Sequence, residues 1–435
     1  MDTIYALSSG AGKAGVAVVR LSGPDTARVV GSMCGGLPHP RMAELRTLRS
    51  LSGGEAMDRC LVLWFPAPGS FTGEDLVEFH VHGSLGVVRW LLEELGGPGG
   101  LRPADPGEFA RRAFMNGKMD LVEIEGLADI LESESRQQVR QALFHVDGHA
   151  SEVFGSWRSG LIRSLALAEA CIDFSDEEGV ELAARPQILQ AIKVLRAEMG
   201  SELEGAERGR RTRLGVRVVL AGAPNAGKSS LMNAIARRDV AIVSKFAGTT
   251  RDVVEVSLDL GGFAVDLADT AGLRDEVDSE VEQLGIGRTR QRLVQADLVL
   301  LIGSPDAPWP SIDIDSDTIR VWNKVDIGRA QPQARCDVEI SALSGAGLPE
   351  LLDLIELRVA RLASGGEPAL LTRDRQIHAV RQCLACLDRA IVNESSFEIV
   401  AEELRTAARL IDMLVGKVDV EDLLEEIFSK FCVGK

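Results

Sequence analysis

The sequence is short of cations, aromatic residues and long apolar runs. Its 435 residues include 48 Lys and Arg against 65 Asp and Glu, so the formal net charge is −17. Binding nucleic acid without sequence preference needs clustered cations. The excess of acidic over basic residues therefore argues against a general nucleic-acid coat, but it does not exclude a local basic site. No run approaches the roughly 18 apolar residues of a membrane span, and we expect no contact with a membrane.

Cysteine is also scarce, with seven residues at positions 34, 60, 171, 336, 383, 386 and 432. An odd, scattered set is typical of reduced thiols in a cytosol. Cys383 and Cys386 share an apolar segment without a second cysteine pair, so we expect packing there rather than metal binding. The start, MDTIYALSSG, lacks the basic and long apolar regions of a secretory signal. These features predict a cytoplasmic protein.

The chain divides into regions of different pattern, and its length suggests about three domains. Residues 1–118 carry short β-rich runs broken by Gly and Pro, which predicts an α+β domain. Residues 119–210 have the apolar spacing of long helices, and we expect a domain boundary at 205–213. Strands alternate with helices in 211–368, which predicts an inserted α/β domain, and 369–435 return to a helical pattern.

A glycine-rich motif follows the strand predicted at 216–221. Residues 222–229, GAPNAGKS, fit the pattern GxxxxGK[ST] and precede an apolar helix. Backbone N–H groups of such a loop surround phosphates, Lys228 reaches the β- and γ-phosphates, and Ser229 holds Mg²⁺. The nucleotide contacts predicted here are Asn225, Ala226, Gly227, Lys228, Ser229 and Ser230.

Three later segments complete a guanine-nucleotide pattern. The carboxylate of Asp269, at a strand end, can join a Mg²⁺ shell, while Gly272 can donate its N–H to the γ-phosphate. Asp326, in the segment NKVD, can accept both N–H groups of a guanine edge, a donor pair that adenine lacks. The ordered set predicts a Ras-like P-loop GTPase domain. The contacts predicted in these segments are Asp269, Thr270, Ala271, Gly272, Asn323, Lys324, Asp326, Ser341, Ala342 and Leu343.

The residue that orients the attacking water is harder to assign. Thr249 and Thr250 lie where a switch segment must be, and one of them should complete the Mg²⁺ coordination. Many GTPases have Gln directly after the DTAG segment, but Leu273 stands there and cannot hydrogen-bond water. Spacing alone does not choose among the acidic residues that follow, which are Asp275, Glu276, Asp278, Glu280 and Glu282.

Several segments carry a resemblance to a known family. They are DTIYALSS at the start, FTGEDLVEFHVHG at 71–83, RPADPGEFARRAFMNGKMDL at 102–121, IDFSDEE at 172–178 and FCVGK at the end. In content and order they resemble the MnmE (TrmE) family of bacterial tRNA-modification GTPases, over essentially the whole chain.

This resemblance implies a function that composition does not reveal. It implies a potassium-dependent GTPase that drives 5-carboxymethylaminomethyl- or aminomethyl-type modification of the wobble uridine in tRNA. It also implies an N-terminal domain that forms a homodimer and binds a 5-formyl-tetrahydrofolate-type one-carbon donor. An FAD-dependent partner of the MnmG (GidA) type would complete a heterotetramer.

The resemblance also implies roles for individual residues, by matched motif position. Glu282 corresponds to the catalytic glutamate, Lys228 to the phosphate-binding lysine and Cys432 to a tail cysteine proposed to act in modification. Thr250 joins Ser229 as a Mg²⁺ ligand. The implied folate contacts are Arg20, Glu78, Lys118 and Lys435, and the implied K⁺ ligands are Asn225, Ser244, Phe246 and Thr249.

Some alternatives stay open. Glu78, His80 and His82 alternate with apolar residues, which predicts one polar strand face; a face toward a partner is favoured over a His-x-His metal pair. Cys432 could instead be a buried small residue. The arginines of 208–213 could contact tRNA or lie at a hinge. Rival functions for the chain are a ribosome-assembly GTPase and an autonomous folate-dependent transferase.

Overall fold

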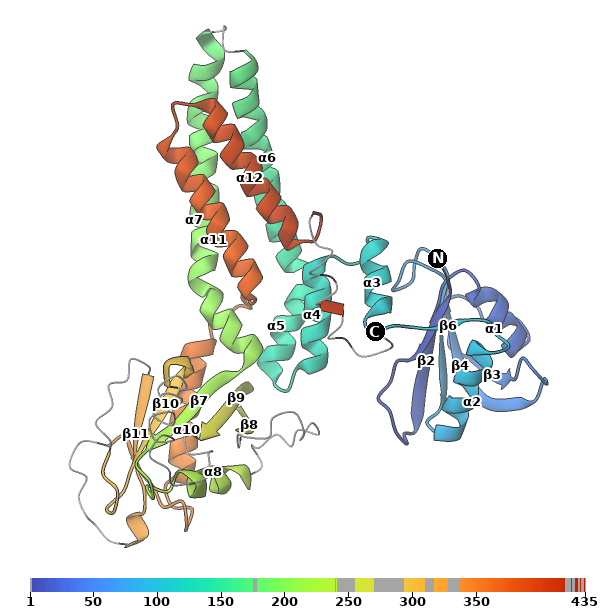
Figure 1. Ribbon diagram of the computed structural model, residues 1–435, viewed down its shortest axis with the longest axis horizontal. Helices are drawn as coiled ribbons and strands as arrows, with labels where there is room; N and C mark the ends of the chain where they lie inside the picture. Colours follow the sequence, from blue (N-terminus) through green and yellow to red (C-terminus); the bar gives the residue numbers. More distant parts are fainter. Residues whose placement is uncertain are drawn as a thin grey trace, which may run out of the picture. The chain divides into compact units, whose positions relative to one another are not determined.

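The computed structural model describes residues 2–174, 178–238, 240, 255–269, 293–309, 317–327 and 336–418, and positions 424, 427, 428, 431 and 434. Its helices and strands confirm the predicted multidomain composition of an α+β part, long helices and an α/β sheet (Figure 1). The chain forms two units, one of Met1–Ala128 with Asp412–Lys435 and one of Asp129–Ile411. Along the described chain, every helix is too short or too polar to cross a membrane.

The first unit contains a six-stranded sheet with the order β3-β4-β5-β2-β1-β6. The strands are β1 (Ile4–Leu7), β2 (Val16–Ser22), β3 (Glu44–Arg49), β4 (Ala56–Phe65), β5 (Leu76–His82) and β6 (Arg102–Pro103). Because side chains alternate along a strand, Val19 of β2 and Phe79 of β5 point to one face. There they pack with the helices α1 (Thr26–Cys34) and α2 (Leu85–Gly96). The opposite face of β5 carries Glu78, His80 and His82, as the alternation predicts.

That opposite face is covered at its β1 end. Phe109, on α3 (Glu108–Met115), is fully buried with Ile4 and Ala6 of β1. Next to it, Phe428 and other residues near the C-terminus pack on α4 (Leu121–Glu132). The final residues of the chain therefore belong to the N-terminal unit, and the helical pattern expected for 369–435 divides near Asp412.

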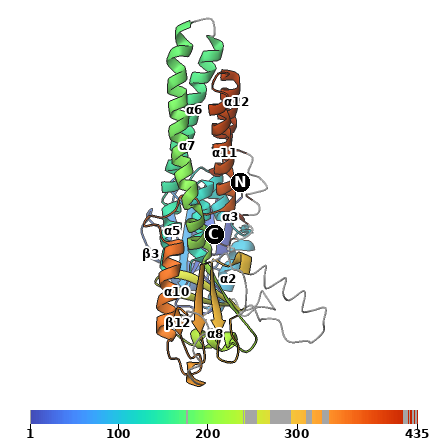
Figure 2. The same cartoon turned by 90° about the vertical axis from the view of Figure 1, so that its left-hand side faces the viewer.

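In the described residues, five helices form the helical part of the second unit. They are α5 (Arg136–Val146), α6 (His149–Asp173), α7 (Glu178–Leu214), α11 (Asp374–Val392) and α12 (Phe397–Leu414). In both views α6, α7, α11 and α12 run side by side (Figures 1 and 2). Cross-helix contacts support this arrangement, since Cys383 of α11 lies 3.6 Å from the sulfur of Met199 on α7. Cys383 and Cys386 are both buried, which agrees with a packing role.

The boundary expected at 205–213 does not interrupt the helix: α7 continues unbroken to Leu214, and β7 begins at Val216. A Cβ at Gly209 would lie 2.5 Å from the Cβ of Ala369, so this glycine permits a close approach of the chain instead of ending the helix. The neighbouring arginines form ion pairs, with Arg211 Nε 2.7 Å from Asp297. Arg211 therefore makes a contact within the chain, and because the helix is continuous through 208–213 these contacts support neither a hinge nor a tRNA patch there.

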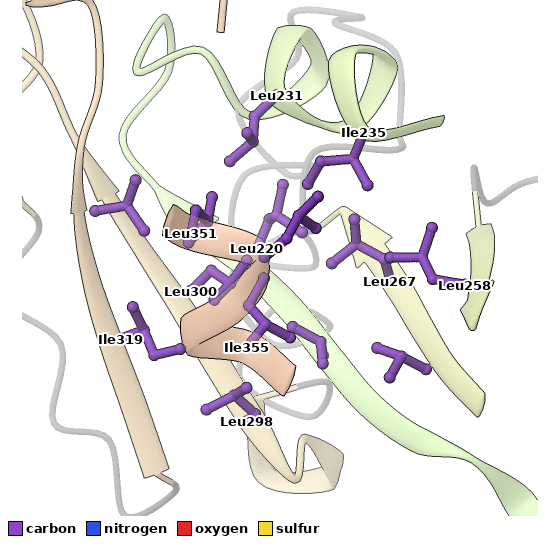
Figure 3. Close-up of a cluster of buried hydrophobic side chains, with 14 of the residues drawn as sticks. Leu220, Leu231, Ile235, Leu258, Leu267, Leu298, Leu300, Ile319, Leu351 and Ile355 are labelled. Carbon is purple, nitrogen blue, oxygen red and sulfur yellow. The ribbon is translucent and has the colours of Figure 1, made fainter. Parts of the chain in front are cut away.

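The α/β part of the second unit has a sheet of order β12-β11-β10-β7-β9-β8. Its strands are β7 (Val216–Gly222), β8 (Glu255–Leu260), β9 (Phe263–Asp269), β10 (Leu298–Gly303), β11 (Asp317–Trp322) and β12 (Val338–Glu339). All neighbours are parallel except β8 and β9. The helices α8 (Lys228–Ala236) and α10 (Leu348–Ala363) pack on one face, where Leu231, Ile235, Leu351 and Ile355 are buried (Figure 3).

The strand order determines where a ligand can bind. β7 lies between β9 and β10 in the sheet. The strands that follow β7 first, β8 and β9, lie on one side of it, and the later strands β10, β11 and β12 lie on the other. In open α/β sheets, such a reversal leaves a crevice at the carboxyl ends of the strands. The segment that joins β7 to α8 is the glycine-rich motif, which therefore occupies this edge.

Candidate functional site

The glycine-rich segment forms a tight loop between β7 and α8. Gly227 adopts a left-handed conformation (φ 96°), as does Asn225 (φ 64°). The Lys228 ammonium donates to the carbonyls of Gly222, at 3.0 Å, and Ala223, at 3.2 Å. Burial lowers the pKa of Lys228, and the charge of Asp269 opposes that shift. A cation and the N-terminus of a helix thus meet at one loop, which is the arrangement that binds phosphates.

Two oxygen-bearing side chains from different motifs meet beside this loop. Ser229, in the first turn of α8, donates its hydroxyl to the carboxylate of Asp269, at the end of β9, over 3.0 Å. Asp269 is 5% exposed. Hydroxyl and carboxylate oxygens are the ligands that Mg²⁺ prefers. The pair therefore fits a hard divalent cation next to the phosphate loop.

Asn323 joins the loop to the segment after β12. Its amide nitrogen donates to the Ala226 carbonyl at 3.0 Å, and its amide oxygen accepts the Ala342 N–H at 3.0 Å. The side chain is 1% exposed. A Cβ at Gly227 would lie 2.2 Å from the Asn323 amide nitrogen, so only glycine fits there. The NKVD segment (323–326), residues 341–343 and the glycine-rich loop therefore form one packed structure.

Asp326 lies at the open side of this structure. The Ser341 hydroxyl donates to one carboxylate oxygen of Asp326 over 2.5 Å, and accepts the Ser344 N–H at 3.1 Å. This fixes the carboxylate while Asp326 stays exposed. A fixed and accessible carboxylate can accept two adjacent N–H donors of a purine edge. Leu343, which is 88% exposed, is accessible beside it.

Sequence reasoning missed one neighbour of this site. Lys324 forms an ion pair of 3.1 Å with Asp306, in the loop after β10. Asp306 belongs to no motif, and only its place at the end of a central strand could have pointed to it. The pair holds the Lys324 side chain at the same edge of the sheet as Asp326.

Part of the predicted nucleotide site lies outside the described residues. The contacts brought together are Asn225, Ala226, Gly227, Lys228, Ser229, Ser230, Asp269, Asn323, Lys324, Asp326, Ser341, Ala342 and Leu343. The predicted residues outside the described part are Ser244, Phe246, Thr249, Thr250, Thr270, Ala271, Gly272 and Glu282.

A second polar cluster lies in the N-terminal unit, on the face of the sheet opposite α1 and α2. Arg20 of β2 and Glu78 of β5 are cross-strand partners. Arg20 donates to the Oε1 atom of Glu78 from Nε at 3.1 Å and from Nη2 at 2.8 Å. Burial opposes ionisation of Glu78, but the charge and hydrogen bonds of Arg20 outweigh it and lower the pKa of Glu78. A charged pair is thus held on a half-buried surface.

Two aromatic rings surround the Arg20 side chain, and one further predicted residue of the unit, Lys118, is described. The Arg20 guanidinium lies over the rings of Phe71, at 5.5 Å, and Phe109, at 5.6 Å. The aliphatic part of Lys118 lies against Gly73, two residues after Phe71, because a Cβ at Gly73 would lie 3.2 Å from the Lys118 Cγ. The Ser8 hydroxyl donates to the Gly434 carbonyl over 2.9 Å, which fixes the tail beside β1. Lys435 and Cys432 lie outside the described residues.

The His-x-His pair divides between two partners. The Nε2 atom of His80 lies 3.2 Å from Oε2 of Glu78, whereas Nδ1 of His82 lies 2.7 Å from Asp58. Within the described residues no cluster of three His, Cys, Asp or Glu side chains could hold a metal ion. The geometry agrees with a polar strand face.

Comparisons with known proteins decide the family. The family model "MnmE helical domain" matches residues 121–432, and "GTP-binding protein TrmE N-terminus" matches residues 3–118. The chain belongs to the MnmE family of tRNA modification GTPases. The first match spans most of the chain because the α/β part interrupts the helical part.

Curated MnmE relatives match along almost their full length. "tRNA modification GTPase MnmE" of Beijerinckia indica is 47% identical over 100% of this chain and 96% of its own. Proteins of the same name from Azorhizobium caulinodans and Rhizobium meliloti are 48% and 46% identical, each over 100% of this chain and 99% of their own. Every part of this chain therefore has a counterpart in these MnmE proteins.

Proposed function

We propose that this chain hydrolyses GTP at the β7–α8 edge and uses the cycle to drive modification of the wobble uridine in tRNA, of the 5-carboxymethylaminomethyl or aminomethyl type. The observation that carries the proposal is the packed structure around Asn323. Hydrogen bonds of Asn323 join the phosphate loop to residues 341–343, and Ser341 of that segment holds the carboxylate of Asp326. The names of the MnmE relatives supply the substrate class. The proposed division is an N-terminal domain at 1–118, a GTPase domain at 211–368, and a helical domain in two parts, 119–210 and 369–435.

Guanine selection follows from hydrogen-bond chemistry. The Asp326 carboxylate, fixed by Ser341, accepts N1–H and the exocyclic amine of guanine. Adenine presents an unprotonated N1 and no amine at that position, so its binding leaves the carboxylate unpaired. A site built to pair a polar group strongly rejects an analogue that lacks the partner.

Two cations fit the phosphate end of the site. Ser229, beside Asp269, would bind Mg²⁺ together with Thr250, and the ion would supply charge neutralisation at the β- and γ-phosphates. Asn225 has an exposed side chain on the loop, and its amide oxygen suits K⁺. The other proposed K⁺ ligands are Ser244, Phe246 and Thr249. Glu282 is proposed to orient the attacking water, because Leu273 cannot.

The proposed one-carbon donor is a folate of the 5-formyl-tetrahydrofolate type, bound in the N-terminal unit. Arg20 and Glu78 offer a fixed cation and carboxylate beside the rings of Phe71 and Phe109. A flat heterocycle with N–H donors and acidic tail groups fits this chemistry. Lys118 and Lys435 would add cations, and Cys432 is proposed to act near the substrate uridine.

The same sheet face supports a homodimer through the N-terminal domain. Leu45 of β3 and Leu61 of β4 are direct cross-strand partners, 55% and 43% exposed. Adjacent exposed leucines on a sheet are typical of a contact surface. We further propose a heterotetramer with an FAD-dependent MnmG-type partner, which would carry the redox chemistry. The net charge of −17 makes such a partner a better source of tRNA contacts than this chain alone.

Turnover in matched salts tests the nucleotide and cation assignments. GTP hydrolysis should be faster in KCl than in NaCl at equal ionic strength, and Asn225→Ala should remove the difference. Equal turnover in both salts would remove potassium from the proposal. Glu282→Ala should bind GTP normally yet hydrolyse it roughly 100-fold more slowly; hydrolysis at the original rate would remove Glu282.

Folate binding separates this function from the ribosome-assembly alternative. The full chain should bind 5-formyl-tetrahydrofolate, and Arg20→Met should weaken that binding without changing GTP hydrolysis. An assembly GTPase has no need of the folate, so failure of the full chain to bind 5-formyl-tetrahydrofolate would favour that rival.

A further inference from the structure

The carboxylate of Glu78 is held by different partners at its two oxygens. Both Arg20 hydrogen bonds, from Nε and from Nη2, end on Oε1. The other oxygen, Oε2, contacts the Nε2 atom of His80 at 3.2 Å. Arg20 therefore fixes one oxygen only, and rotation of the carboxylate about its terminal bond is opposed by His80.

The position of His80 in the sheet makes this contact possible. It lies two residues after Glu78 on β5, so both side chains emerge on the same face. Its lateral partners are Leu61 of β4 and Val18 of β2. These apolar neighbours contribute no competing hydrogen bond, and the imidazole is directed along the strand to Glu78. The His80 side chain is 30% exposed, so it borders the surface from which a ligand would approach.

His82 provides an internal comparison. It follows on the same strand, but its ring lies 2.7 Å from Asp58 and its backbone N–H donates to the same carboxylate at 2.8 Å. Asp58 belongs to β4 and is not a member of the Arg20–Glu78 pair. His80 is therefore linked to the proposed folate site through Glu78, whereas His82 on the same strand face is held by Asp58 and is not linked to it.

We infer that His80 is a positioning residue of the folate site: it donates Nε2–H to Oε2 of Glu78 and so fixes the plane of that carboxylate. This inference rests on the proposed folate function. With Arg20 on one oxygen and His80 on the other, the remaining lone pairs of Glu78 point in fixed directions toward the open face. A ligand with adjacent N–H donors, as in a 2-amino-4-oxopyrimidine ring, then meets a preorganised acceptor, which lowers the cost of binding.

The test uses the full chain and three variants. His80→Leu removes the donor, His80→Gln keeps an N–H donor at a similar reach, and His82→Gln is the matched control on the same strand face. Binding of 5-formyl-tetrahydrofolate is measured by calorimetry, together with the melting temperature and GTP hydrolysis. Loss of a hydrogen bond to a charged group should weaken folate binding roughly 10-fold in His80→Leu. His80→Gln should stay within about threefold of the original chain, and His82→Gln should bind folate like the original.

Each outcome bears on a defined claim. If the original chain binds no folate, the proposed folate function fails and this inference fails with it. If the original binds and His80→Leu binds equally well, the inference alone is overturned. Equal weakening in His80→Leu and His80→Gln, at unchanged melting temperature, would also overturn it, because the donor would then not matter. A loss in His80→Leu that His80→Gln restores supports it.

Discussion

The side-chain amide of Gln141 forms two opposed hydrogen bonds with the backbone of Ala369. It donates to the Ala369 carbonyl at 2.7 Å and accepts the Ala369 N–H at 2.8 Å. Gln141 is 5% exposed. Ala369 lies where the chain returns from α10 to the helical part, so α5 holds this return segment by its backbone. The contact links two positions 228 residues apart.

Removal of this contact should loosen the return segment. Gln141→Leu keeps the volume but leaves the half-buried Ala369 N–H without this partner, while the Ala369 carbonyl keeps a 3.2 Å contact with His145 Nε2; the loss costs about 1–3 kcal/mol. Hydrogen exchange at the Ala369 amide should accelerate correspondingly. Gln187→Leu is the control, since Gln187 is exposed and donates only to a carbonyl of its own helix. Unchanged exchange at Ala369 in Gln141→Leu would mean that other contacts hold the segment.

Arg112 should be a major source of stability in the N-terminal unit. It is 6% exposed and donates to the carboxylates of Glu74, at 2.9 Å, and Asp2, at 2.8 Å. Arg112→Met leaves Glu74 half-buried without its cation, and we expect a loss of about 3–5 kcal/mol. Arg28→Met removes an exposed pair with Asp25, worth about 1 kcal/mol or less. Melting of the two variants compares them, and similar melting temperatures would contradict this account of Arg112.

The N-terminal unit should lose stability in acid over a defined range. The hydrogen bond from Arg102 is the main reason that the pKa of Asp2 falls to about 2. A carboxylate with a lowered folded-state pKa stabilises the fold above its unfolded pKa, near 3.9, and loses that effect as pH falls to the folded value. The melting temperature should therefore fall between about pH 4 and 2. In Asp2→Asn this fall should be shallower; an identical pH profile would rule out a contribution from Asp2.

Nucleotide choice should depend on the carboxylate of Asp326. Asp326→Asn replaces one acceptor by an N–H donor, which faces the donors of guanine. We expect the KM for GTP to rise roughly 10- to 100-fold, as for the loss of a charge-assisted hydrogen bond. Xanthosine triphosphate, which has a carbonyl in place of the amine, should become the better substrate. Steady-state kinetics with both nucleotides gives the answer, and an unchanged preference for GTP would place base recognition elsewhere.

The nucleotide motifs could be predicted from the sequence because each is a local pattern. The glycine-rich loop and the NKVD segment directly follow apolar strands, and parallel strands bring their carboxyl ends to one edge. The pairs Lys324–Asp306, Gln141–Ala369 and Arg112–Glu74 could not be predicted, because distant segments meet without any periodic signal.

Composition located one boundary without its structure. Glycine and arginine at 205–213 predicted a boundary, and the helical segment does end at Leu214, but Gly209 serves a close approach inside a continuous helix. The two histidines lie on the same face of β5, and only their side-chain partners distinguish them: His80 contacts Glu78 of its own strand, and His82 contacts Asp58 of β4. Residue type and spacing thus located the polar face but not the partner of each side chain.

Nucleoside analysis of tRNA tests the central claim most directly. A strain that lacks this chain should lose the modified wobble uridine, and the original gene should restore it. Lys228→Ala, which removes the ammonium at the phosphate loop, should fail to restore it although the protein accumulates normally. Full restoration by Lys228→Ala would contradict the claim that GTP hydrolysis by this chain drives the modification.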